Sequence, residues 1–139
     1  MTVYTDEIHL STKGEVQILD LRGELEGVCS RSGVLTGILH CFVPGATGAL
    51  SFIEYEPGLI EDFPAFLERI APKGIDYAHH RTWDDGNGHS HVRATLIKPD
   101  ISIPIREGRL VLGKWQHPIL IELDVRPRDR TLLVTVTGE

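Results

Sequence analysis

The sequence has few cysteines, no excess of positive charge and no long apolar run, and each shortage excludes a class of protein. Cys29 and Cys41 are the only cysteines; they are too few and too isolated for a disulfide framework, and no C-x-x-C motif occurs. We interpret both as reduced residues of the core. The 139 residues include 14 basic and 20 acidic side chains, a net charge of −6, whereas nucleic-acid-binding proteins normally have a basic excess. Nucleic acid is therefore not an expected partner.

Targeting and nucleotide-binding motifs are also missing. No apolar run approaches the roughly 20 residues of a membrane helix, and residues 1–20 lack the pattern of a signal peptide. We therefore expect a cytoplasmic protein with no membrane partner. There is no Walker loop, G-x-G-x-x-G, G-x-S-x-G or H-E-x-x-H. With 41% hydrophobic and 24% charged residues, the composition is ordinary for a globular protein, and we predict a single domain over residues 1–139.

Apolar periodicity predicts an α+β fold dominated by antiparallel strands, built as a two-sheet sandwich or a pseudo-barrel. One helix is expected over 21–31, capped by Asp20 and ended by Ser32-Gly33. A second lies in 58–71, its regular part starting at Asp62 as N-cap so that Pro64 falls in the first turn. The chain beyond residue 90 is expected to be strand. Expected strands are 3–10, 15–19, 34–43, 49–54, 101–105, 109–112, 119–125 and 132–136. The nearly all-apolar segment 34–43 should be covered on both faces.

Four of the seven histidines lie between residues 79 and 91, in the segment HHRTWDDGNGHSH. If a strand begins near residue 89, then His89, His91 and Arg93 leave the same face of the sheet, together with Thr95. Neutral imidazoles that converge from a strand and a neighbouring loop are suitable ligands for Zn²⁺. The alternative is a hydrogen-bonded loop with surface histidines.

Other polar residues allow two interpretations each. Glu54 is a candidate general base or metal ligand, or else a solvated acid near a helix start. The turn with Arg126, Arg128 and Arg130 is either an anion clamp or a solvated hairpin turn. Trp115 is expected to be a core or interface anchor, and His40 a satisfied core histidine.

From Gly33 to the C-terminus the chain resembles the YjbQ-like family, also named the secondary thiamine-phosphate synthase family. The resemblance is carried by FVPGATGALSFIE (42–54), YAHHRTWDDGNGHSHVRATL (77–96), SIPIREGRLVLGKWQ (102–116) and the RPRDR turn. It implies a β-sandwich or pseudo-barrel that assembles as a homotrimer. It also implies a weak activity that joins a pyrimidine diphosphate to a thiazole phosphate and releases pyrophosphate. The family's polar positions correspond to Thr47, Glu54, His79, Asn87, His91 and Gln116.

The resemblance and the residue patterns together define a candidate site. The expected catalytic residues are Glu54, Asn87 and Gln116. The expected substrate contacts, to a small phosphorylated molecule, are Thr47, Arg93 and Arg128. The expected ligands of a divalent metal, Zn or Mg, are His79, His91 and His89, with His91 the most important histidine. The alternatives are a non-catalytic trimer that binds a small anion or metal, and a metal-dependent hydrolase.

One departure from the family pattern concerns the turn after residue 43. Many members read P-H-T-T-A-A-L where this chain reads Pro44-Gly45-Ala46-Thr47-Gly48-Ala49-Leu50. The histidine is replaced by Gly45, which predicts a reduced or remodelled site.

Overall fold

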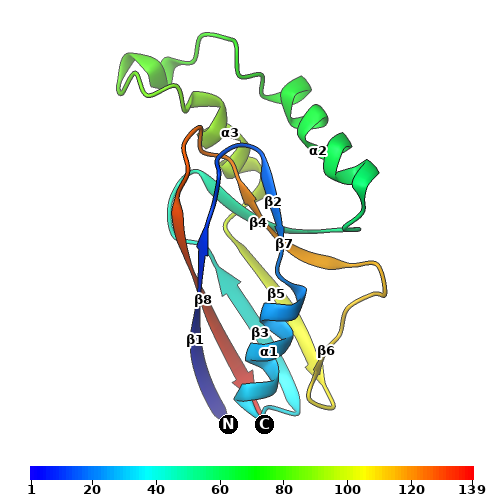
Figure 1. Ribbon diagram of the computed structural model, residues 1–139. Helices are drawn as coiled ribbons and strands as arrows, with labels where there is room; N and C mark the ends of the chain where they lie inside the picture. Colours follow the sequence, from blue (N-terminus) through cyan, green and yellow to red (C-terminus); the bar gives the residue numbers. More distant parts are fainter.

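Two antiparallel sheets and three α-helices make up the computed structural model, which describes residues 1–139 (Figure 1). The strands are β1 (Thr2–Ser11), β2 (Gln17–Asp20), β3 (Thr36–Phe42), β4 (Gly48–Ile53), β5 (Asp100–Arg106), β6 (Arg109–Leu110), β7 (His117–Glu122) and β8 (Asp129–Gly138). The helices are α1 (Arg22–Ser32), α2 (Pro57–Ile70), the 3₁₀ helix η1 (Ala78–Arg81) and α3 (Gly88–Ile97). The larger sheet has the order β1-β8-β3-β5-β6, and the smaller one β2-β7-β4. The expected α+β fold with two mostly antiparallel sheets is confirmed.

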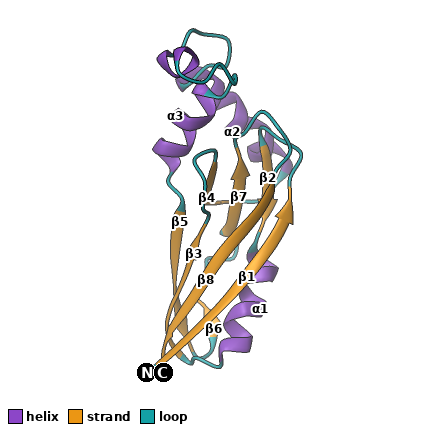
Figure 2. Ribbon diagram, turned by 90° about the vertical axis from the view of Figure 1, so that its left-hand side faces the viewer, coloured by secondary structure: helices purple, strands orange, loops and turns teal.

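The smaller sheet is a middle layer, because its two faces contribute to two different apolar clusters. Leu120 of β7 joins a cluster of 17 buried residues, which includes Leu25 of α1 and Leu39 of the larger sheet. Ile119 on the same strand points the other way, into a cluster of 7 buried residues that lies under α2 and α3. This alternation follows from the two-residue period of a strand, and each such leucine or isoleucine stabilises the fold by about 2 kcal/mol. The second cluster holds α2 and α3 at the end of the molecule opposite the two termini (Figures 1 and 2).

The C-terminal end of α1 agrees with the sequence, and its start lies one residue after the expected one. Gly33 ends α1 with φ 71°, a left-handed conformation that glycine adopts without steric cost. Asp20 accepts a hydrogen bond from the Arg22 amide (3.0 Å), although the N-cap residue itself is Leu21.

The expectation that Asp62 caps α2 is wrong, because the N-cap is Glu56, six residues earlier. The Glu56 carboxylate caps it by accepting from the amides of Gly58 and Leu59 (2.9 and 2.6 Å). Pro57 occupies the first turn, where its missing N–H costs nothing, and Pro64 is accommodated inside the helix.

A third helix, α3, replaces the strand expected from residue 89. The polar and apolar residues of 91–96 happen to alternate, which suggested a strand. The residues that are actually buried, including His89, Ser90, Arg93 and Ala94, follow helical spacing instead. Packing against β4 and the rest of the smaller sheet decides the outcome, since the local sequence fits either period.

The outward face of the larger sheet is uncovered in the single chain, contrary to the expectation for residues 34–43. Figure 2 shows this face, formed by β1, β8, β3 and β5. Ile38 and Phe42 of β3 and Leu133 of β8 are exposed on it. His40 lies on the same face, 3.0 Å from Asp100, so its expected place in the core is wrong. No helix is long and apolar enough to cross a membrane.

Candidate functional site

Three segments that are distant in the sequence meet where α3 begins and form an open hollow. They are the turn before β4, the segment from η1 to the start of α3, and the connection between β7 and β8. The volume of about 420 Å³ is within the range of small-molecule sites. The lining residues are Gly45, Ala46, Thr47, His79, Trp83, Asp85, Asn87, His91, Asp124, Arg128 and Arg130. We call this hollow the α3 pocket.

One wall of the α3 pocket is a cluster of metal-ligating side chains. His79 comes from η1, Asp85 from the following loop and His91 from α3, and their ligand atoms all lie within 4.8 Å of one another. The rings of His79 and His91 lie against each other at a tilt of 49°, with their centroids 4.5 Å apart. The buried Nε2 of His79 lies 3.2 Å from Asp85 Oδ1 but makes no hydrogen bond. Two imidazoles and one carboxylate are ligands that Zn²⁺ and similar transition metals accept.

Asp85 is held in the charged form that a metal ligand requires. Its Oδ1 accepts a hydrogen bond from the Asn87 amide (3.0 Å). This bond, together with the nearby His79, keeps the pKa of the Asp85 carboxyl below its usual value despite some burial.

The floor of the pocket is organised by the buried Asp124. Its Oδ2 accepts from Thr47 Oγ1 (2.9 Å) and from Nε and Nη2 of Arg128 (2.9 and 2.7 Å). Its Oδ1 accepts from Asn87 Nδ2 (3.2 Å) and from the Arg126 amide (2.9 Å). Burial alone would raise the pKa of Asp124, but these donors outweigh it and lower the pKa to about 2. With its lone pairs engaged, Asp124 positions the pocket residues and does not serve as a proton acceptor.

A second buried carboxylate lies beneath the floor. Glu122 forms a bidentate pair with Nε and Nη2 of Arg130 (2.9 and 2.6 Å) and accepts from Thr12 Oγ1 (2.6 Å). Arg130 Nη2 also donates to Thr47 Oγ1 (2.9 Å), which links this pair to Asp124. The network fixes the turn before β4 against the connection between β7 and β8.

The structure brings together five of the residues that the sequence analysis assigned to the candidate site. They are Thr47, His79, Asn87, His91 and Arg128. Asn87 is fully used inside the fold, because its Oδ1 accepts from Ser90 Oγ and from the Val125 amide (2.9 and 3.1 Å). It supports the pocket and does not carry a free catalytic group.

His89 and Arg93 lie on the opposite side of α3, so the expectation that they share a face with His91 is wrong. In a helix, residues two positions apart point about 200° away from each other, whereas in a strand they would share a face. His89 is buried with Nε2 at 2.6 Å from Glu15 Oε2. Arg93 is buried and donates to the Ala71 carbonyl and to Glu68 Oε2 (3.0 and 2.9 Å). Both tie α3 to the rest of the fold.

Glu54 and Gln116 do not line the α3 pocket either. They lie together at another hollow, beside Trp115 and Lys114. Gln116 Oε1 accepts from the Gly113 amide (3.1 Å) within its own loop. Trp115 is 62% exposed, which excludes a place in the core. A catalytic role for Glu54 and Gln116 at the metal-ligating cluster is therefore not supported within one chain.

The sequence interpretation left Asp85, Asp124 and the exposed Trp83 out of the site, and it named Arg130 only within the turn that forms either an anion clamp or a solvated hairpin. Asp85 lay within the histidine-rich segment, and Arg130 within the basic turn, so composition gave a signal for both. Asp124 gave none, because its role depends on partners from four other positions.

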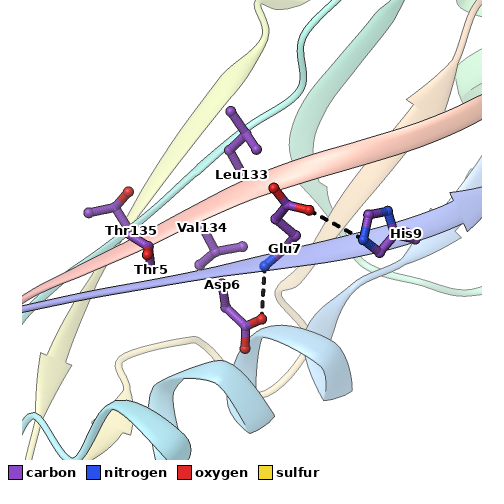
Figure 3. A pocket seen from close by; sticks show the side chains of 7 residues that line it. All are labelled: Thr5, Asp6, Glu7, His9, Leu133, Val134 and Thr135. Atoms are coloured by element: carbon purple, nitrogen blue, oxygen red, sulfur yellow. Dashed lines mark hydrogen bonds and ion pairs between the residues drawn. The ribbon is translucent and has the colours of Figure 1, made fainter.

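The largest hollow lies elsewhere, on the outward face of the larger sheet, with a volume of about 590 Å³. Figure 3 shows its side chains along β1 and β8, including Glu7 and His9. Glu7 Oε2 lies 3.3 Å from His9 Nε2. This hollow holds a single histidine and no cluster of three metal ligands. The chemistry therefore favours the α3 pocket as the functional site.

Comparisons with known proteins find relatives that match nearly the whole chain. A family model described as UPF0047 protein YjbQ-like matches residues 6–139. A UPF0047 protein of Methanothermobacter thermautotrophicus is 36% identical over 139 residues, which are 100% of this chain and 95% of the relative. A UPF0047 protein of Archaeoglobus fulgidus is 36% identical over 128 residues, covering 92% and 97%.

Solved structures show the same fold. A YbjQ-like protein of unknown function from Sulfolobus solfataricus matches with a TM-score of 0.94 and 33% identity, covering 99% of each chain. A hypothetical protein from Aeropyrum pernix matches with a TM-score of 0.91 and 34% identity, covering 98% of this chain and 99% of the other.

Proposed function

The chain belongs to the YjbQ-like UPF0047 family, and we propose that its α3 pocket binds a divalent metal ion and a small phosphorylated molecule. The observation that carries this proposal is the cluster of His79, Asp85 and His91 in an open pocket, with two arginines in its lining. The reaction we propose is of the type that the family resemblance implies, the joining of a pyrimidine diphosphate to a thiazole phosphate with release of pyrophosphate.

The three ligands fit a metal ion. Their donor atoms are close enough to share one ion with small side-chain adjustments, since metal–nitrogen and metal–oxygen bonds are about 2.0–2.2 Å long. The orphaned Nε2 of His79 is a buried nitrogen without a hydrogen bond, and a metal ion would satisfy it. When bound, such an ion supplies Lewis-acid stabilisation of negative charge on phosphate oxygens.

The chain's own residues contribute charge and orientation. Arg128 is part-exposed at the pocket and provides positive charge where pyrophosphate would leave. Asp124, through Thr47 and Asn87, holds the two sides of the pocket at a fixed separation. Trp83 is 72% exposed at the rim and offers a flat surface to a ring of the ligand.

Metal content and turnover test this proposal. The untagged protein would be stripped with chelator and titrated with Zn²⁺, Mn²⁺ and Mg²⁺, and formation of thiamine phosphate would be measured with and without metal. We expect near one ion per chain and metal-dependent turnover, both absent in His79→Ala. Failure of every metal to bind would contradict the proposal.

A non-catalytic binding module is the second candidate, and one observation favours it. The expected acid–base residues Glu54 and Gln116 lie outside the α3 pocket, and the pocket carboxylate Asp124 is fully hydrogen-bonded. This candidate predicts that metal and phosphate bind without turnover.

We also propose that copies of the chain assemble as a homotrimer in the cytoplasm. The uncovered apolar face of the larger sheet supports assembly, because Phe42 and Leu133 are register partners on neighbouring strands and both are exposed. The cytoplasm is consistent with two unpaired cysteines that are both buried.

A further inference from the structure

Arg130 is nine-tenths buried, yet one end of its guanidinium group has no protein partner. Its side chain is 8% exposed, and its Nε and Nη2 are taken up by Glu122 and Thr47. Nη1 donates to no acceptor in the chain, and it is not among the polar atoms sealed away from solvent. A guanidinium has five N–H donors, so the two on Nη1 are free at the α3 pocket, which Arg130 lines.

Gly45 keeps the space in front of this nitrogen open. A Cβ atom at position 45 would lie 2.9 Å from Arg130 Nη1, closer than real Cβ contacts allow. Gly45 also has φ 110°, a conformation that other residues rarely adopt. Any side chain here would therefore cover the free donor, and glycine leaves a gap through which Nη1 reaches the pocket.

Further donors line the same pocket. Arg128 binds Asp124 through Nε and Nη2, so its Nη1 is also free, and its side chain is 46% exposed. The backbone amides of Gly45, Ala46 and Thr47 make no hydrogen bond within the chain. The buried carboxylates Glu122 and Asp124 are already paired with the two arginines, and the remaining carboxylate of the pocket, Asp85, belongs to the cluster with His79 and His91.

We infer that the Gly45 gap is an oxyanion subsite, in which Arg130 Nη1 and Arg128 Nη1 bind a phosphate or diphosphate group. This inference rests on the proposed function in that it assigns the anionic part of the ligand to one side of the α3 pocket and the metal cluster to the other. A tetrahedral oxyanion has three or more oxygens to accept from both arginines and the turn amides, whereas a carboxylate has only two. Terminal phosphate groups are therefore the class of ligand that the subsite selects.

Titration of the metal-free protein tests the subsite separately from the metal. Chelator-treated protein would be titrated with inorganic pyrophosphate, phosphate and acetate at constant ionic strength, by calorimetry and by amide-resolved NMR. We expect pyrophosphate and phosphate to shift the amide resonances of residues 45–47, with acetate binding at least tenfold more weakly.

Two variants and a matched control identify the donors. Arg130→Lys retains the charge but removes Nη1, and we expect about tenfold weaker pyrophosphate binding. Arg128→Ala should weaken pyrophosphate binding by a similar factor. Because Arg128 is more exposed, this variant tests the subsite even if Arg130→Lys fails to fold. Arg126→Ala lies in the same turn but outside the pocket lining, and should change binding less than twofold.

Two results would overturn the inference. One is pyrophosphate binding that leaves the resonances of residues 45–47 unmoved, and the other is equal affinity in Arg128→Ala and Arg126→Ala. His91→Ala separates this inference from the proposed function, because it should lose metal while keeping metal-free pyrophosphate binding. Metal binding by the wild type without pyrophosphate binding would reject the subsite alone.

Discussion

Asp124 accepts hydrogen bonds from Thr47, Asn87, Arg128 and the Arg126 amide while its side chain has no exposed surface. A buried charge is tolerated only when it is paired and hydrogen-bonded, and here the partners come from each segment that lines the α3 pocket. Asp124 therefore links the stability of the fold to the geometry of the site.

Asp124→Asn is expected to destabilise the protein by roughly 2 kcal/mol at neutral pH. The folded pKa of about 2 lies below the unfolded value near 3.9, so the carboxylate stabilises the fold fully above about pH 4. That stabilisation is lost as the pH falls towards 2. Chemical unfolding of both proteins between pH 7 and pH 2 should give curves that converge at low pH. A constant difference across that range would contradict the assignment.

His91 lies beside His79 and Asp85 at a half-buried position, without a side-chain hydrogen bond inside the fold. A residue held this loosely contributes little to stability, while a metal would depend on it as one of three ligands. A substitution of His91 should therefore weaken metal binding much more than it lowers the stability of the fold.

His91→Ala is expected to weaken metal binding by more than about a hundredfold, since loss of even an outer partner of a ligand costs 10–100-fold. The free energy of unfolding of the metal-free protein should change by only about 0.5 kcal/mol. Metal titration and thermal unfolding check the two effects. Thr95→Ala, one turn further along the same helix and exposed, is the control and should retain full metal affinity.

At the scale of elements, α3 places its polar residues on two opposite sides. One side presents Asn87 and His91 to the pocket, and the other buries His89 and Arg93 against Glu15 and Glu68. The Arg93 guanidinium also satisfies the Ala71 carbonyl at the end of α2. The position of the metal-ligating cluster thus depends on a buried anchor behind it.

Arg93→Ala is expected to lower the free energy of unfolding by about 2 kcal/mol, because it leaves the buried Ala71 carbonyl without its side-chain donor. The lost pair with Glu68 adds little, since the Glu68 side chain is 55% exposed and still accepts from the Lys73 amide. Denaturant unfolding measures this loss. Arg81→Ala, which removes an exposed pair with Asp76, is the control and should cost less than 1 kcal/mol. If Arg93 instead bound substrate, stability would be unchanged and ligand affinity would fall.

At the scale of the whole molecule, the larger sheet presents one face to the core and the other to solvent (Figure 2). Ile38, Phe42 and Leu133 are all exposed on the outward face. Threonines and two histidine–acid pairs, His9 with Glu7 and His40 with Asp100, occupy much of the remaining outward face, including the hollow of Figure 3. An exposed apolar strip within a polar surround is typical of an interface between subunits.

Leu133→Asp is expected to convert the proposed homotrimer into monomers, because a charge buried in an apolar interface carries a large desolvation penalty. Sedimentation should give three times the 15.5 kDa chain mass for the wild type and one chain mass for the variant. Leu96→Asp, at an exposed position on α3, should leave the assembly intact. A wild type that sediments as a monomer at micromolar concentration would reject the trimer.

The order of most elements and one segment of the candidate site could be predicted from the sequence. Alternating apolar residues identified the strands around residues 101–105 and 132–136, and Gly33 marked the end of α1, because both signals are local. The concentration of histidine, aspartate and asparagine in residues 79–91 pointed to the segment that lines the α3 pocket.

Only the tertiary structure decided which of those residues meet. Residues 91–96 satisfy the periods of both a strand and a helix, and burial against the smaller sheet selects the helix, which turns His89 and Arg93 away from His91. Asp124 and Arg130 lie far along the chain from residues 45–47, and they become partners only when β7 and β8 fold over the turn before β4. Hydrophobic periodicity depends on residues that are close together in the sequence, so the sequence reveals it directly. A binding site is formed by residues that are far apart in the sequence, and only the folded structure shows how close they lie in space.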